Sequence, residues 1–272
     1  MQAKTILLMS LVFALCLSCA ACTGGQQTAG QEEGEETMLV NGESTGPAEE
    51  EAPAFDPLVP ASEGVDPQWF ADAAFVGDSV SVMLENYNTN TSVLTTPTFL
   101  CSVSLSQTNA LSYEAGSSRL PEYPKGSGQH PKVEDSIAAA GAKKVYLMLG
   151  MNCIAGGVDR ASGDLVKLVD RILEKSPEAT ILIQSVTPMT ATSPRTDESL
   201  NNTTIQAFND KMKEICQERE WYYINVAEAV SDEQGFLRDD YSGDQAMGIH
   251  FNYNGAKAWA DYLLTHVPDA LK

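Results

Sequence analysis

Apolar residues recur along residues 70–267 in two alternating patterns. Short apolar runs, several of them ended by Gly or Pro, predict buried strands, whereas apolar residues at every third or fourth position predict amphipathic helices. The runs that predict strands cover residues 73–76, 98–103, 144–149, 180–186 and 221–226. The stripes that predict helices cover residues 164–175, 202–219 and 253–266, and a further helix is expected to begin at Ser79.

Strands that alternate with helices of this length are typical of βαβ units and a parallel sheet. We therefore expect residues 67–272 to form a three-layer α/β/α sandwich around a central, mostly parallel sheet of about five strands. In such sheets the ligand binds outside the carboxyl ends of the strands. The residues that follow each strand are therefore the first place to look for chemistry.

The first 22 residues have the features of an export signal. Lys4 provides a positive start, and residues 6–21 are apolar or small but fall short of the ~20 apolar residues that span a membrane. The small residues before Cys22 resemble a bacterial lipoprotein signal, which implies lipidation of Cys22 and anchoring on the outer face of the cytoplasmic membrane. Lipidation of Cys19 and a plain secretory signal are the alternatives.

Residues 23–66 are expected to form a disordered acidic linker. Gly, Glu, Gln, Thr, Ser and Pro dominate this stretch, and residues 26–66 hold 11 acidic and no basic side chains. The whole chain has 37 acidic and 17 basic residues and a formal net charge of −20. This balance argues against a nucleic-acid partner and against a basic membrane-binding face.

The cysteines and acidic clusters of the predicted domain do not suggest a metal. An odd number of cysteines without CxxC or Cys/His spacing fits neither a disulfide framework nor zinc. The acidic cluster at residues 239–244 lacks the EF-hand spacing, so a solvated loop is favoured over a calcium site. We expect no metal and no cofactor. The cysteines in question are Cys101, Cys153 and Cys216.

Three segments place groups suited to acyl transfer at the expected strand ends. Ser79 follows the first strand at a Gly-Asp turn, Asn152 follows the third strand, and His250 precedes the last helix. A serine, a histidine and an amide donor at one edge are the parts of an acyl-transfer site. Taken singly, Ser79 could merely cap a helix, and Asn152 could merely bridge a turn.

Together these segments resemble the sequence blocks of the SGNH/GDSL hydrolases, in order and spacing, over residues 70–267. Residues 77–79 (Gly-Asp-Ser) match the nucleophile block, and residues 150–152 match most of the Gly-x-Asn-Asp block. His250, with Asn252 and Gly255 after it, matches the histidine block. The resemblance implies a flavodoxin-like fold and a metal-independent serine carboxylic-ester hydrolase.

The resemblance also implies a role for each matching residue. Ser79 would be the nucleophile, and its backbone N–H would donate to the oxyanion together with the side chain of Asn152. His250 would act as general base and then as general acid. The family takes a further oxyanion N–H from a glycine after the second strand, and no glycine stands there. The backbone of Ser102 or Ser104 is the expected substitute, with Ser104 preferred.

Two further positions depart from the family pattern. Cys153 replaces the Asp of the third block, and Met247 stands three residues before His250, where the family has its acid. Met247 cannot orient an imidazole, since its sulfur is only a weak acceptor. Asp244 is the nearest candidate acid and would need Gly243 and Gly248 to fold the loop back. Because the spacing is changed, the sequence favours a Ser79–His250 dyad with a backbone carbonyl acceptor over a triad with Asp244.

These features predict a cell-surface esterase that hydrolyses O-acyl groups, short and carbohydrate-linked, through an acyl-serine intermediate. Residues 104–135 and 190–200 are expected to rim its pocket. Two alternatives stay open, namely transfer of acyl groups between glycans and a catalytically idle, SGNH-like binding lipoprotein. The substrate preference rests on the expected location and on the family resemblance.

Overall fold

The computed structural model describes residues 54–193 and 199–272. The strands are β1 (Ala73–Gly77), β2 (Thr98–Cys101), β3 (Lys144–Met148), β4 (Thr180–Gln184) and β5 (Tyr222–Ile224). The helices are α1 (Ser79–Thr91), α2 (Gln107–Ser112), α3 (Val133–Ala140), α4 (Val158–Lys175), α5 (Asn202–Arg219), α6 (Val226–Val230) and α7 (Tyr253–Thr265).

The five strands form one sheet in the order β2-β1-β3-β4-β5, and every pair is parallel. This confirms the expected α/β fold with a central parallel sheet. Each strand lies within its predicted run or extends it by one residue, and most are shorter, because pairing stops where the chain turns away at the carboxyl edge. The short helices α2, α3 and α6 were not anticipated, since each has too few residues to show a periodic apolar stripe.

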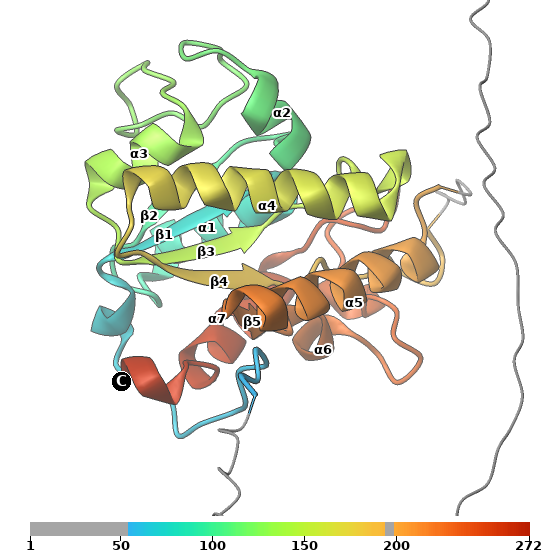
Figure 1. Ribbon diagram of the computed structural model, residues 1–272. Helices are drawn as coiled ribbons and strands as arrows, with labels where there is room; N and C mark the ends of the chain where they lie inside the picture. Colours follow the sequence, from blue (N-terminus) through green and yellow to red (C-terminus); the bar gives the residue numbers. More distant parts are fainter. Residues whose placement is uncertain (1–53, 194–198) are drawn as a thin grey trace, which may run out of the picture. The chain divides into compact units, whose positions relative to one another are not determined.

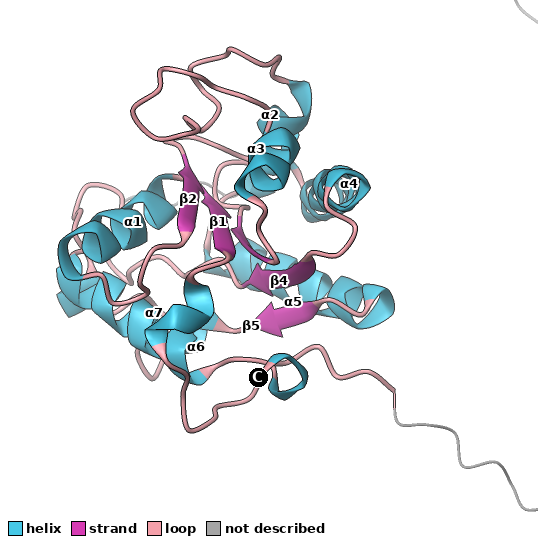
Figure 2. Ribbon diagram, turned by 90° about the vertical axis from the view of Figure 1, so that its left-hand side faces the viewer, coloured by secondary structure: helices cyan, strands magenta, loops and turns pink. Residues whose placement is uncertain are grey.

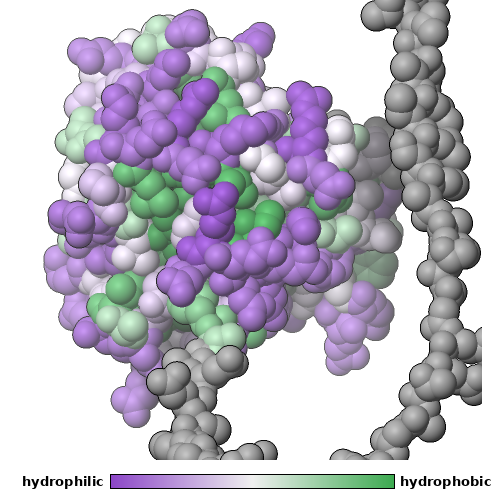
Figure 3. Space-filling view, viewed as in Figure 1, coloured by the Kyte–Doolittle hydropathy of each residue, from purple (hydrophilic) through white to green (hydrophobic). Residues whose placement is uncertain are grey.

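Helices cover both faces of the sheet (Figures 1 and 2). Helices α1, α6 and α7 lie on one face, and α2, α3, α4 and α5 lie on the other. The outer surface of the α4 and α5 layer is mostly hydrophilic, with hydrophobic side chains visible between the polar ones (Figure 3). The apolar stripe of α4 is buried against the sheet, as its periodicity predicted.

The central strands form the best-buried part of the core. All five residues of β1 are buried, and the ring of Phe75 stacks on that of Tyr146 with 4.7 Å between centroids. On the same face of the sheet, Trp259 of α7 is fully buried and donates its indole N–H to Gln184 Oε1 at 2.8 Å. This hydrogen bond satisfies both polar groups and fixes α7, which follows the histidine segment, against the sheet.

The folded domain begins earlier than the sequence indicated. Residues 57–59 lie beside β5, where Tyr223 donates its N–H to Pro57 O at 2.6 Å and accepts from Val59 N at 3.0 Å. The side chain of Val59 is 2% exposed. The linker prediction is therefore wrong for this end of residues 23–66, because a parallel edge strand leaves backbone groups that a passing segment can satisfy.

The expected signal segment with Cys19 and Cys22, and residues 23–53 of the expected linker, lie outside the described residues. Within the described part of the chain, no helix is both long enough and apolar enough to cross a membrane.

Candidate active site

Ser79 lies at the turn between β1 and α1, at the carboxyl edge of the sheet. The preceding residue, Asp78, caps the helix, because its Oδ1 accepts the N–H of Val80 at 2.9 Å. Ser79 is the first residue of α1 and is half-buried. The capping role that could have explained Ser79 is therefore filled by Asp78, and the serine hydroxyl is left for another partner.

That partner is His250, 171 residues further along the chain, whose Nε2 lies 2.9 Å from Ser79 Oγ. The histidine stands two residues before the N-cap of α7, Asn252, whose side chain accepts hydrogen bonds from the N–H groups of Asn254 and Gly255. The cap and the buried helix behind it hold the histidine segment in place. The structure thus brings the two expected groups together.

The other imidazole nitrogen of His250 faces Asp244. His250 Nδ1 is hydrogen-bonded to Asp244 Oδ2. Asp244 Oδ1 accepts the backbone N–H groups of Met247 at 2.8 Å and Gly248 at 2.7 Å. The dyad interpretation, with a backbone carbonyl on Nδ1, does not match this geometry. Met247, which occupies the usual acid position, instead contributes a backbone donor that orients Asp244.

The contacts of Asp244 favour its ionised form. Partial burial raises the pKa of this carboxyl, but the hydrogen bonds from the imidazole and from two backbone N–H groups outweigh burial. The pKa of Asp244 therefore lies below its ordinary value. An ionised carboxylate is the state that an imidazole donor requires.

Two glycines allow the loop between Asp244 and His250 to close on itself. Gly243 donates its N–H to His250 O at 2.8 Å, and a Cβ at Gly243 would lie 2.4 Å from Phe251 O. Gly248 has a φ of 67°, a left-handed conformation that favours glycine, and donates its N–H to Asp244 O at 2.8 Å. This turn compensates for the changed spacing and places Asp244 opposite the imidazole.

The two hydrogen bonds of His250 determine its tautomer. An ionised carboxylate can only accept, so Nδ1 carries the proton and Nε2 accepts the hydrogen bond from Ser79 Oγ–H. An imidazole in this state can take the hydroxyl proton as Oγ attacks a carbonyl carbon. The carboxylate of Asp244 can then stabilise the imidazolium that forms.

Asn152 lies beside this centre, but both hydrogens of its amide nitrogen are engaged. Nδ2 is 3.2 Å from Asp78 Oδ2 and 3.1 Å from Leu105 O. The side chain therefore bridges the Ser79 turn and the segment after β2. To stabilise an oxyanion, it must share or release one of these hydrogens when substrate binds.

Asp78 is a site residue whose function the sequence did not reveal. Its side chain is 2% exposed, accepts a hydrogen bond from Asn152 and lies next to Ser79. Burial raises the pKa of Asp78 to about 6, although the N–H of Val80 and the charge of His250 oppose that rise. An acidic residue directly between a buried strand and a serine was the available signal.

The turn after β2 distinguishes the two serines that could supply a further oxyanion N–H. Ser102 donates its N–H to Gly77 O at 3.1 Å and is engaged. The N–H of Ser104 has no acceptor among the described residues, and Ser104 is exposed with a φ of 63°. Asn152 donates a hydrogen bond to the carbonyl of Leu105, the residue that follows Ser104 in the chain. Ser104 is therefore next to a residue that contacts the amide donor. It stays the candidate.

Cys153, which replaces the usual Asp, is half-buried with its Sγ 3.4 Å from Gly150 O. Burial raises the pKa of this thiol to about 12, so it stays neutral. Across the described parts of the chain, no group of three or more His, Cys, Asp or Glu side chains could hold a metal ion.

The two segments expected to rim the site contribute differently. Residues 104–135 contain α2 and the start of α3, and Leu105 contacts Asn152. From residues 190–200, Thr190 donates its N–H to Gly248 O at 2.9 Å and so supports the loop that holds Asp244. Residues 194–198 lie outside the described part of this segment.

Comparisons with solved structures agree with the fold. The chain aligns with a protein described as an acylhydrolase from Bacteroides fragilis (TM-score 0.56, 13% identity, 75% of this chain and 88% of that one). It also aligns with one described as a platelet activating factor from Streptococcus pneumonia (TM-score 0.54, 19% identity, 74% and 84%). A GDSL-like lipase from Bacteroides thetaiotaomicron gives a TM-score of 0.52 at 13% identity over 70% and 84%.

These structural likenesses concern the fold alone. A search of curated proteins found no match. The model of the GDSL-like Lipase/Acylhydrolase family matches residues 75–258, a span that includes Ser79, Asn152, Asp244 and His250. Because this match covers more than half of the chain, the protein belongs to the GDSL-like lipase/acylhydrolase family and is a hydrolase of acyl esters.

Proposed function

We propose that this acyl-ester hydrolase is a serine esterase that removes short acyl groups from carbohydrate at the outer face of a bacterial membrane. The observation that carries the proposal is the chain of hydrogen bonds from Ser79 through His250 to Asp244. Ser79 attacks the ester carbonyl, and its proton passes to His250 Nε2. The imidazolium then protonates the leaving alcohol, and water releases the acyl group from Ser79.

Three groups are proposed to stabilise the oxyanion that forms during both steps. The backbone N–H of Ser79 lies at the first turn of α1, where the helix dipole favours negative charge. The side chain of Asn152 and the backbone N–H of Ser104 are the other donors. Preorganised donors of this kind are among the largest contributions to acyl-transfer catalysis.

The preference for a short acyl group is supported by the packing beneath the nucleophile turn. The hollow there is lined by Asp78, Val80, Gly150 and Thr187, among others, and measures about 10 Å³. That volume suits about one water molecule. This hollow is too small for a long acyl chain, whereas an acetyl group needs no interior channel.

The carbohydrate substrate and the membrane location rest on the leader. Lys4, the apolar run up to Ala21 and the cysteine that follows support export and lipid anchoring. An esterase held there faces the cell wall and extracellular polymers, whose hydroxyls carry short acyl groups.

The proposal is tested by the rates at which the protein hydrolyses aryl acetate, butyrate and octanoate, and by acetate release from acetylated polysaccharides. We expect kcat/KM to fall with chain length and acetate release to exceed that of the Ser79→Ala variant. Faster hydrolysis of octanoate than of acetate would contradict the short-acyl proposal. A sugar acceptor added to the same assay shows whether the acyl group is transferred instead of hydrolysed.

A further inference from the structure

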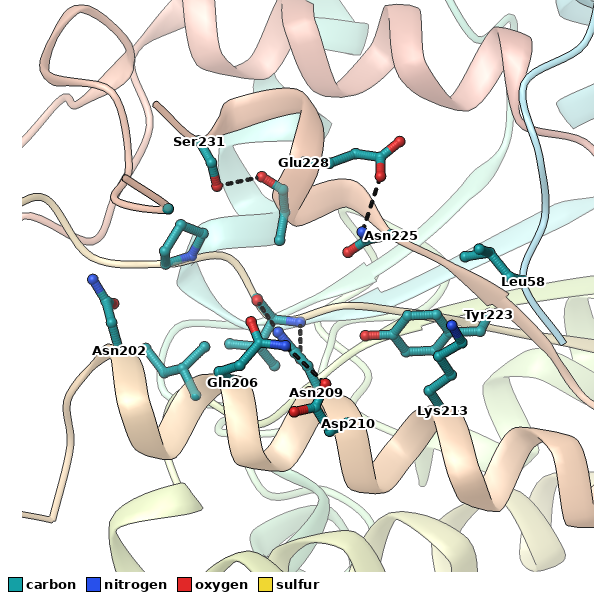
Figure 4. A pocket seen from close by; sticks show the side chains of 15 residues that line it. Leu58, Asn202, Gln206, Asn209, Asp210, Lys213, Tyr223, Asn225, Glu228 and Ser231 are labelled. Carbon is teal, nitrogen blue, oxygen red and sulfur yellow. Dashed lines mark hydrogen bonds between the residues drawn. The ribbon is translucent and has the colours of Figure 1, made fainter. Parts of the chain in front are cut away.

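A second cavity lies apart from the Ser79–His250 centre. It has a volume of about 380 Å³ and lies between α5 and the segment that contains β5 and α6 (Figure 4). Neither Ser79, His250 nor Asp244 lines it. Its volume falls within the range of small-molecule sites, roughly 300–1,000 Å³. Its polar lining includes Gln206, Asp210, Lys213, Asn225 and Glu228.

The cavity, which we call the α5 groove, has a rigid wall on the side of the catalytic edge. Val186 lines both the α5 groove and the small hollow beside Asp78. Asn209 holds the backbone of Val186 by two hydrogen bonds of 2.8 Å, one to its N–H and one to its carbonyl. The α5 groove and the hollow beside Asp78 therefore share Val186 as a lining residue, and the backbone of that residue is held in place by Asn209.

The polar groups of the α5 groove retain hydrogen-bonding capacity. Gln206 Nε2 donates to Asp210 Oδ1 at 2.8 Å, and Asn225 Nδ2 donates to Glu228 Oε2 at 3.0 Å. Each amide therefore keeps its oxygen as an acceptor. Lys213 is exposed, and its ammonium has no hydrogen bond or ion pair with any residue the structure describes.

These groups fit one class of ligand best. The amides, the carboxylates and the ammonium together offer both hydrogen-bond donors and acceptors. Because the carboxylates and the ammonium have opposite charges, the cavity does not favour a strongly charged ligand. Val186, Pro188 and Ile205 add apolar surface to the same cavity. A sugar, which has adjacent hydroxyls on an apolar ring, matches this combination of polar groups and apolar surface.

We propose that the α5 groove binds a neutral oligosaccharide and so retains the glycan part of the ester substrate. The binding itself rests on the α5 groove alone. Its part in catalysis rests on the proposed function, because only a glycan ester would gain from a second point of attachment.

Binding is tested with probes that carry no acyl ester, so that no ester hydrolysis is involved. The probes are β-1,4-linked tetramers of glucose, xylose and N-acetylglucosamine, titrated against the protein by saturation-transfer NMR. We expect at least one tetramer to bind saturably. Gln206→Ala and Lys213→Ala should each weaken binding roughly fivefold, the effect of losing a hydrogen bond of about 1 kcal/mol.

Lys211→Ala is the matched control, since Lys211 lies on the same helix, pairs with Glu214 and does not line the α5 groove. It should bind like the unmodified protein. Failure of all three tetramers to bind would overturn the proposal. Binding that neither groove variant weakens would also overturn it, because the sugar would then lie elsewhere.

The role in catalysis has a separate readout. With the acetylated form of the polymer whose tetramer binds, Lys213→Ala should raise KM for the polymer by a larger factor than KM for an aryl acetate. Equal factors would refute the role in substrate retention. If the protein bound the saccharide but had no esterase activity, the proposed function would be contradicted. The assignment of the α5 groove as a saccharide site would still stand.

Discussion

Replacing Asp78 by Asn tests whether the buried carboxyl beside Ser79 lowers the stability of the folded protein at neutral pH. Burial raises the pKa of Asp78 from 3.8 to about 6. A folded-state pKa above the unfolded one means that the folded protein binds the proton more tightly. Asp78 therefore contributes stability at low pH that is lost as the pH rises through about 6. A shift of about two pKa units corresponds to roughly 3 kcal/mol.

The Asp78→Asn variant cannot titrate at this position, so it lacks that dependence. We therefore compare the free energies of unfolding of the variant and of the unmodified protein. Between pH 4 and pH 7 their difference should shift in favour of the variant by up to about 3 kcal/mol. The assay is urea unfolding of both proteins at unit steps from pH 4 to pH 8. Glu178→Gln, an acid-to-amide change at an exposed position, is the control and should give a difference that does not vary with pH. A flat difference for Asp78→Asn would refute the reasoning.

The same substitution should impair catalysis. The introduced amide can still cap α1 through its oxygen, but its nitrogen would then face the amide nitrogen of Asn152. Two donors cannot bond to each other, so Asn152 would rotate and present its oxygen. We expect kcat at pH 7 to fall by roughly 10²–10³, as for the loss of one oxyanion donor, with little change in KM. An unchanged kcat would show that Asp78 does not position Asn152.

Three other predictions concern the centre and its attachment. Asp244→Asn should lower kcat about 10⁴-fold with the fold intact by circular dichroism, whereas Met247→Asp should not raise it. A loss below about tenfold would restore the dyad interpretation. Asn152→Ala should lower kcat roughly 10²–10³, and a change in KM alone would contradict an oxyanion role. Cys22→Ser should release the protein from the membrane fraction of an expressing bacterium, whereas Cys19→Ser should not. Equal fractionation of these two variants would count against lipidation at Cys22.

The sheet and the nucleophile turn could be predicted from the sequence because their signals are local. A buried run that ends in Gly-Asp-Ser specifies a strand, a turn and a helix start within a few residues, as residues 73–79 do. The partner of Ser79 was also predictable, since His250 stands immediately before an amphipathic helix. Glycines at both ends of the turn that precedes His250, Gly243 and Gly248, made the approach of Asp244 conceivable.

What the sequence could not decide depends on contacts between distant segments. Asp244 faces the imidazole because Gly243 pairs with His250 and because Met247 and Gly248 turn their N–H groups inward. Residue spacing alone suggested that this loop was too long. The α5 groove likewise depends on the distance between α5 and the end of β5. No local sequence pattern specifies that distance.

The most direct test of the central claim is the site at which a fluorophosphonate probe reacts. The triad geometry predicts one adduct per protein, located by peptide mass spectrometry on Ser79 and absent from Ser79→Ala. His250→Ala should slow its formation by orders of magnitude, because the hydroxyl would lose its base. An adduct on another serine, or labelling that persists in Ser79→Ala, would contradict the account.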